Sequence, residues 1–236
     1  MSPTLPAVAA ISLALGVRHA FEPDHLAAVS TLATRQGRSF RAAWLGLAWG
    51  LGHTTSIAAV ALIVIAGGLT LPARLWPAAD VLVGLLLVAL GTAVLWRYAR
   101  GRWHMHRHAH DREEGGGPHL HLHSHAQGVS HEHMHAHWGW RRALGFGLLH
   151  GLAGSGAIII LLVTTVPTPA LKLAYVAAFG LGTIVGMLAV SVVLVAVVRY
   201  AARWGERWAA ALHLAAAAAS VGIGCLLVVT TFSSLR

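Results

Sequence analysis

Long apolar stretches separated by short charged ones dominate the pattern of this chain. The segments 57–71 and 143–171 contain no Asp, Glu, Lys or Arg. A helix that crosses a bilayer needs about 20 predominantly apolar residues, and a helix satisfies its own backbone hydrogen bonds in lipid. These segments are too long for barrel strands. We therefore predict an all-α integral membrane protein with about six transmembrane helices, at residues 5–34, 41–67, 76–98, 140–166, 169–200 and 207–232.

The composition agrees with this pattern and argues against two other classes of protein. Only 11% of the residues are charged, whereas a soluble domain has about a quarter. The formal charge of +9 invites a nucleic-acid-binding function, but the arginines lie in short loops, where they direct membrane topology. We therefore expect a lipid bilayer as partner and no nucleic acid. The first apolar segment lacks a basic stretch before it and is interpreted as a membrane helix rather than a signal peptide. Cys225 lies in an apolar run and is expected to be a small buried residue.

The positive charges are distributed unequally between the two sides of the predicted bundle. Thirteen of the 17 Lys and Arg fall on one side: Arg35, Arg38, Arg41, Arg97, Arg100, Arg102, Arg107, Arg112, Arg141, Arg142, Arg199, Arg203 and Arg207. The other side carries Arg74, Lys172 and Arg236. Because cytoplasmic loops are rich in Lys and Arg, we predict a multi-pass protein of the cytoplasmic (inner) membrane with both termini outside.

Two short motifs occur twice in the sequence. Gly16–Ala20 (GVRHA) resembles Gly147–Gly151 (GLLHG), and Ala48–His53 (AWGLGH) resembles Ala178–Thr183 (AFGLGT). The histidine of the first motif precedes the last residue of the second motif by 34 residues in one half and by 33 in the other. This agreement in order and spacing indicates an internal repeat.

The repeat divides the chain into two membrane halves joined by a loop. Residues 1–98 and 140–236 each hold three predicted helices, and residues 99–139 form the loop. An odd number of helices per half requires that the halves have opposite orientations. Inverted repeats are typical of secondary transporters, which bind their substrate near the membrane midplane between the repeats.

A cluster of ionisable residues lies inside the first predicted helix. His19, Asp24 and His25 are costly in a membrane and therefore indicate a functional site. Imidazole suits nickel, copper, zinc and iron, and a carboxylate adds a harder ligand. On an unbroken helix His19 and Asp24 would point about 140° apart. Pro23 is expected to kink or unwind the helix, to free the carbonyl of His19 and to bring the side chains together.

A structural interpretation of the same segment is also open. The segment could be a helix end at the membrane interface, with Arg18 and Glu22 forming an i,i+4 ion pair. We expect that ion pair in either case. The metal role is assigned to His19, Asp24 and His25 together.

Two more histidines lie inside predicted helices. His53 is followed by three hydroxyl residues at positions 54–56 that can orient its ring or line a path. His150 is the repeat counterpart of His19 and lies among glycines that allow close helix packing or a helix break. The alternative for each is a histidine that is hydrogen-bonded between helices. Together with the first cluster, both are predicted to contact metal.

The loop at residues 99–139 is rich in histidine. It contains 12 of the 17 histidines in alternating runs: His104, His106, His108, His110, His119, His121, His123, His125, His131, His133, His135 and His137. Tracts of this composition bind metal, so we predict a secondary, metal-buffering role. With glycines at its centre, the loop is expected to be disordered without metal. A loop that changes charge near neutral pH is the alternative.

These motifs resemble the nickel/cobalt transporter family. The resemblance rests on His19-x4-Asp24-His25 and on Leu51-Gly52-His53, and it covers most of the chain outside the loop. The segments 150–157 and 179–187 look more like the urease-accessory branch of that family. The resemblance implies transport of Ni²⁺ or Co²⁺ as substrate, with His19, Asp24, His25 and His53 in contact with the metal. It also suggests nickel chaperones of urease or hydrogenase maturation as partners.

The sequence departs from the larger uptake members of that family. Those proteins have about eight helices and an acidic motif in a later helix, whereas residues 180–187 contain no acid. The histidine-rich loop is also similar to that of the efflux branch. Three functions therefore stay open: uptake, efflux, and a membrane-bound metallochaperone.

An enzyme is not expected, because the predicted membrane helices contain no HExxH motif and no nucleophile–base pair. It also has no phosphate-binding loop for ATP. Inward movement of a divalent ion gains about 4.6 kcal/mol per 100 mV of membrane potential, which favours uptake without ATP.

Overall fold

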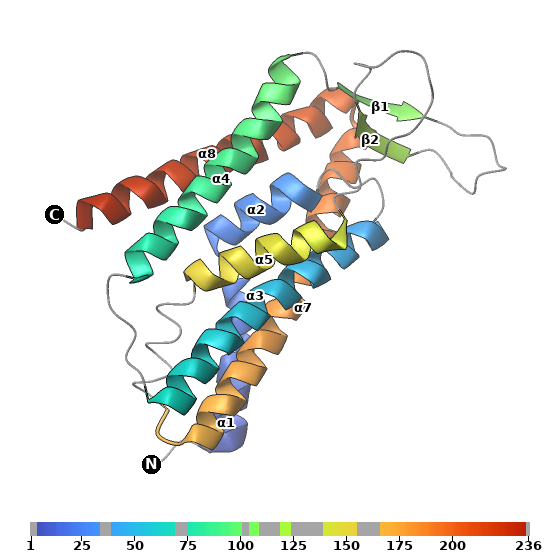
Figure 1. Cartoon of the computed structure of the whole chain (residues 1–236). Helices are drawn as coiled ribbons and strands as arrows, with labels where there is room; N and C mark the ends of the chain where they lie inside the picture. Colours follow the sequence, from blue (N-terminus) through green and yellow to red (C-terminus); the bar gives the residue numbers. More distant parts are fainter. Residues whose placement is uncertain are drawn as a thin grey trace.

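The computed structural model describes residues 4–33, 39–68, 75–100, 104–108, 119–123, 139–154 and 166–234. Its helices are α1 (Leu5–His19), α2 (Pro23–Ala33), α3 (Ser39–Gly67), α4 (Leu75–Ala99), α5 (Trp140–Gly154), α7 (Pro169–Arg203) and α8 (Glu206–Ser234). Two short strands, β1 (His104–His108) and β2 (His119–His123), pair antiparallel. The two chain termini lie away from these strands (Figure 1).

The helices have the length and composition of membrane spans, as predicted. In the described part of the chain, α3, α4, α7 and α8 are each long and apolar enough to cross a membrane. The consecutive helices α1 and α2 together make a fifth candidate, bent by 54°. The rest of the helix predicted at residues 140–166 includes positions 155–165, which lie outside the described residues, so the sixth span stays a prediction.

The first predicted helix is broken where proline was expected to break it. The α1 helix ends at His19, and a turn follows in which the N–H of Phe21 donates to Arg18 O at 2.9 Å. The α2 helix then begins at Pro23, whose lack of an N–H suits a first helical position. The prediction that the carbonyl of His19 would be free was wrong, because it accepts the N–H of Glu22 at 3.0 Å.

The helix pair α1–α7 crosses at two glycines. A Cβ on Gly16 would overlap Phe179 O and lie 2.9 Å from Thr183 N. A Cβ on Gly182 would lie 3.0 Å from Val17 N. The hydroxyl of Thr183 also lies 3.3 Å from Gly16 O. Only glycine allows these two backbones to approach so closely.

The helix pair α3–α5 crosses in the same way. A Cβ on Gly147 would overlap Trp49 O and lie 3.0 Å from His53 N, and a Cβ on Gly52 would lie 2.9 Å from Leu148 N. In the sequence repeat, Gly147 corresponds to Gly16 and Gly52 to Gly182. The repeated motifs therefore make equivalent backbone contacts in two separate helix pairs.

A third pair, α4–α8, completes the bundle. A Cβ on Gly84 would lie 2.8 Å from Gly224 O, and the hydroxyl of Ser220 donates to Leu87 O at 3.0 Å. The helices α2 and α5 lie between this pair and the group formed by α1, α3 and α7 (Figure 1). The end of α1, the start of α2, the middle of α3 and the last turns of α5 meet in the interior of the molecule.

The outer faces of the helices are apolar. Leu62, Val193 and Leu226 are among many large hydrophobic side chains that are more than 45% exposed, as expected for a surface covered by lipid. Cys225 lies on this outer face. The prediction that it is buried was wrong, because an apolar sequence environment is the same for a lipid-facing and a protein-facing position.

The strands β1 and β2 lie in the histidine-rich loop, where no strand was expected. Their register pairs His104 with His123, His106 with His121, and His108 with His119. The other six loop histidines fall outside the described residues: His110, His125, His131, His133, His135 and His137. The metal-buffering role of the loop and its disorder without metal stay predictions.

Candidate metal site

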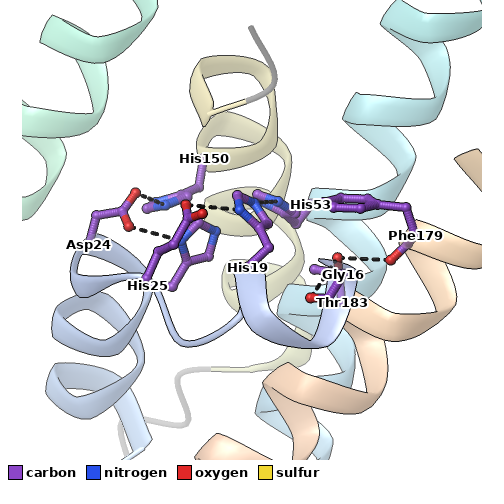
Figure 2. Close-up of polar contacts among 9 residues, drawn as sticks. Gly16, His19, Asp24, His25, His53, His150, Phe179 and Thr183 are labelled. Atoms are coloured by element: carbon purple, nitrogen blue, oxygen red, sulfur yellow. Dashed lines mark hydrogen bonds and ion pairs between the residues drawn. The ribbon is translucent and has the colours of Figure 1, made fainter. Parts of the chain in front are cut away.

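Four histidines from four helices meet at the break between α1 and α2. His19 is the last residue of α1, His25 lies in the first turn of α2, His53 in the middle of α3, and His150 near the end of α5. Figure 2 shows their rings close together, with Asp24 beside them. The side chains of His25, His53 and His150 are fully buried, and His19 is 4% exposed. The structure thus brings together all five intramembrane residues that the sequence analysis selected.

His25 lies at the centre of this cluster. Its ring centroid is 4.4 Å from that of His19, 4.9 Å from that of His53 and 4.3 Å from that of His150. The bend after α1 makes this position possible, since α2 turns back toward α5 instead of continuing the line of α1. The bend was expected from Pro23, but it was expected to bring His19 and Asp24 together, and these two residues belong to different groups of potential ligands.

The rings of His19 and His53 face one another through their Nε2 atoms, which lie 3.1 Å apart. A metal–imidazole bond is about 2.0–2.1 Å long, so two ring nitrogens on one ion lie about 3 Å apart when the bonds meet at a right angle. The spacing therefore fits two ligands of one ion as well as a histidine–histidine hydrogen bond.

Two carboxylates hold the outer nitrogens of three of these rings. Glu22 Oε2 lies 2.9 Å from His19 Nδ1, Asp24 Oδ1 lies 3.0 Å from His25 Nδ1, and Asp24 Oδ2 lies 3.1 Å from His150 Nε2. Metal-binding histidines typically donate their second N–H to such a carboxylate, which fixes the ring and raises its basicity. Three of the four histidine rings already have such a carboxylate partner in this structure.

Glu22 has a different partner from the one predicted. The sequence suggested an ion pair with Arg18, but the ion pairs of the described residues place Glu22 on His19 instead. The helix ends at His19, so the i,i+4 geometry that the prediction assumed does not exist there. Glu22 was therefore missed as a residue of the site.

Several nitrogens in the cluster lack a hydrogen-bond partner. His25 Nε2, His53 Nδ1 and His150 Nδ1 are buried and unpaired. Buried polar atoms are normally paired, and exceptions need an explanation. A bound cation would account for His25 Nε2, because Asp24 lies on the other nitrogen of that ring. His53 Nδ1 and His150 Nδ1 lie across their rings from the Nε2 atoms that face His19 and Asp24.

The polar atoms sort into two groups that can hold an ion. One ring nitrogen from each of His19, His25 and His53 lies within 4.8 Å of the others. An oxygen of Asp24 and a nitrogen from each of His25 and His150 form a second group with the same spacing. His25 belongs to both groups.

Aromatic side chains enclose the histidines. The ring of Phe179 lies 5.4 Å from that of His19, and the ring of Trp49 lies 5.7 Å from that of His150. Trp49 and Phe179 occupy corresponding positions in the two repeated motifs. The sequence analysis quoted both motifs but gave these aromatics no role, since an aromatic residue in an apolar run carries no distinct signal.

The hydroxyls that follow His53 do not orient its ring, contrary to the suggestion from sequence. Thr54 Oγ1 donates to Gly180 O at 3.2 Å, and Ser56 Oγ donates to Leu148 O at 2.7 Å. Thr55 Oγ1 bonds within its own helix. These hydroxyls tie α3 to its neighbours α7 and α5 and thereby fix the height of His53 in the bundle.

Comparison with known proteins gives two matches. Residues 5–147 match the NicO family, described as high-affinity nickel-transport protein. The chain is 29% identical over 184 residues to the urease accessory protein UreH of Bacillus sp. (strain TB-90), which covers 78% of this chain and 74% of that protein. No solved structure matches. The family is one of transporters rather than enzymes, and the resemblance drawn from the motifs is confirmed: this chain belongs to the NicO family of nickel-transport proteins.

Proposed function

We propose that this chain carries Ni²⁺ inward across the cytoplasmic membrane as a secondary transporter, through the cluster at the α1–α2 break. The observation that carries the proposal is the set of four buried histidines and two carboxylates at that break. Ionisable groups inside membrane helices mark ion pathways. The family supplies nickel as the transported ion.

The ligand set supports Ni²⁺ as substrate and Co²⁺ as a weaker one. Imidazole nitrogens bind nickel more tightly than cobalt in the general affinity order. The hard cations Mg²⁺ and Ca²⁺ prefer all-oxygen sites and are disfavoured by His19, His25 and His53. His150 and Asp24 supply the remaining donors from the facing helix and from α2.

We propose six membrane spans arranged as two inverted three-helix repeats. The equivalent glycine contacts support this: α1 crosses α7, and its repeat counterpart α5 crosses α3, which is the counterpart of α7. Each crossing therefore joins one half to the other. The substrate cluster lies where the two crossings meet, as expected for transporters built from inverted repeats.

The membrane potential and the distribution of charge support the inward direction. With the arginine-rich side in the cytoplasm, an incoming divalent cation gains about 4.6 kcal/mol per 100 mV. The sequence contains no ATP-binding loop that would drive the ion outward. Efflux is the opposing outcome of the test below.

The histidine-rich loop at 99–139 would then lie on the cytoplasmic side and receive nickel that has crossed the membrane. Alternating histidines buffer a metal ion by composition alone. The similarity to a protein named as a urease accessory factor supports delivery of this nickel to chaperones of urease or hydrogenase maturation.

The test is the radioactive nickel content of cells that express the wild type or the double variant His19→Ala/His25→Ala. His213→Ala, which replaces a buried histidine of α8 outside the two metal-binding groups, serves as the control. Accumulation that only the double variant loses supports uptake. Depletion below the empty-vector level, again lost in the double variant, means efflux. If all strains match the empty vector, transport through this cluster is wrong and the metallochaperone takes its place.

A further inference from the structure

We propose that the cluster contains two overlapping metal positions that share His25, and that a single ion steps from one to the other during transport. This inference rests on the proposed function. The aspartate position consists of Asp24, His25 and His150, and the histidine position consists of His19, His25 and His53.

The ring of His25 lies between the other ligands of the two positions. Its ring is 4.3 Å from His150 on one side, and 4.4 Å from His19 and 4.9 Å from His53 on the other. The rings of His53 and His150, which belong to different positions, are 5.8 Å apart. An ion held by His25 therefore reaches either set of ligands with a small displacement.

Only one ion occupies the pair at a time. A neutral imidazole has a single nitrogen lone pair, so His25 cannot ligate two ions together. Two divalent cations a few ångströms apart also repel four times as strongly as two unit charges. The positions are thus successive states of one ion rather than a binuclear centre.

The two positions differ in access and in chemistry. The Asp24 side chain is 18% exposed, whereas every residue of the histidine position is buried. The aspartate position offers one carboxylate and two imidazoles, whereas the histidine position offers three imidazoles, which favour nickel and its neighbours over magnesium and calcium more strongly. The aspartate position is therefore the accessible one, and the histidine position selects the ion.

A further carboxylate, that of Asp80, lies on α4, a helix that contacts α2. It is half-buried in a candidate span, and it lies near enough to Asp24 for the two carboxylates to interact electrostatically. Its carboxylate takes part in none of the ion pairs among the described residues. It lies beyond the first turn of α4, so the helix dipole does not account for it. An unpaired acid in a membrane helix is a feature of ion pathways.

The test uses the full-length chain with the twelve loop histidines changed to Asn, so that only the cluster binds nickel. Single substitutions in this background then remove ligands from one position or from both. His150→Asn removes a ligand from the aspartate position only, His53→Asn from the histidine position only, and His25→Asn from both. His213→Asn is the control. Three quantities are measured: nickel bound per chain, the number of imidazole ligands by X-ray absorption, and the initial uptake rate in proteoliposomes.

We expect one nickel per wild-type chain with three imidazole ligands. His150→Asn should still bind one nickel with three imidazole ligands, but its uptake rate should fall about tenfold or more. His53→Asn should keep one nickel with two imidazoles and also lose uptake. His25→Asn should lose both binding and uptake. His150→Gln provides a second variant in case the Asn form fails to fold.

Other results would overturn the inference. Four imidazoles in the wild type, with one lost in both His150→Asn and His53→Asn, would mean a single joint site and leave the proposed function intact. Two nickel ions per wild-type chain would contradict the stepping of one ion. A wild type that neither binds nor transports nickel would remove the proposed function itself.

Discussion

His19 and His53 are 34 residues apart in sequence, and their Nε2 atoms lie 3.1 Å apart in the interior of the bundle. One residue ends α1 and the other lies mid-way along α3, so the pair joins two helices. Because α1 ends at His19, this contact depends on the helix break as well as on the two histidines.

The first prediction concerns this pair. His53→Ala should weaken nickel binding about 10- to 100-fold, because it removes one ligand of the histidine position. Equilibrium binding to the purified protein measures the effect. Thr55→Ala is the matched control: Thr55 lies on the same helix, is exposed, and bonds only within the helix. Equal affinities of the two variants would contradict a ligand role for His53.

The second prediction concerns Glu22, whose carboxylate lies 2.9 Å from His19 Nδ1. Glu22→Gln keeps the shape of the side chain but weakens its pull on the ring N–H, so nickel affinity should fall about tenfold. Arg18→Gln should leave the affinity unchanged, since Glu22 pairs with His19 instead. The prediction fails if the two variants lose affinity equally, which would restore the Arg18–Glu22 pair.

The helices of this fold were predictable from sequence because apolar length is a direct physical requirement of the bilayer. The α7 helix was expected at 169–200 and is found at Pro169–Arg203, and the break before Pro23 follows from the missing N–H. The exposure of Cys225 was not predictable from the sequence. Lipid tails and a helix interior are equally apolar, so composition does not tell an outward face from an inward one.

The candidate site was predictable in its histidines but not in their partners. Buried ionisable residues are rare in membrane helices, which singled out His19, His25, His53 and His150. The partner of Glu22 depended on where α1 ends, to within one residue, and pattern reasoning does not reach that accuracy. Asp80 was overlooked because it is a lone acid near the start of a span, and only the fold brings it toward Asp24.

The third prediction concerns the glycine crossings. Gly147→Ala should destabilise the protein by about 1–3 kcal/mol, since the new methyl group would overlap Trp49 O and push α5 away from α3. Gly145→Ala is the matched control on the same helix, because a Cβ there meets nothing within 4 Å. Thermal unfolding in detergent compares the two. Equal unfolding temperatures would show that the close approach contributes little.

The fourth prediction separates buffering from transport. Changing all twelve loop histidines to Asn should lower the nickel bound per chain and leave the initial uptake rate in proteoliposomes unchanged, because the cluster at the α1–α2 break is intact. A metallochaperone would behave in the opposite way. Loss of function from the loop variant, together with an active His19→Ala/His25→Ala variant, would favour that alternative.

The last prediction concerns the approach of the ion. Asp80→Asn removes a negative charge near Asp24 but no ligand of either metal position. The local concentration of divalent cations at the accessible position should fall, so the KM for nickel should rise while kcat and the number of nickel ions bound at saturation stay the same. Asp80→Glu should restore the KM, because it returns the charge on a slightly longer side chain. A fall in kcat without a change in KM would mean that Asp80 supports the fold or a conformational step instead, since a residue that only attracts the ion has no effect once the site is saturated.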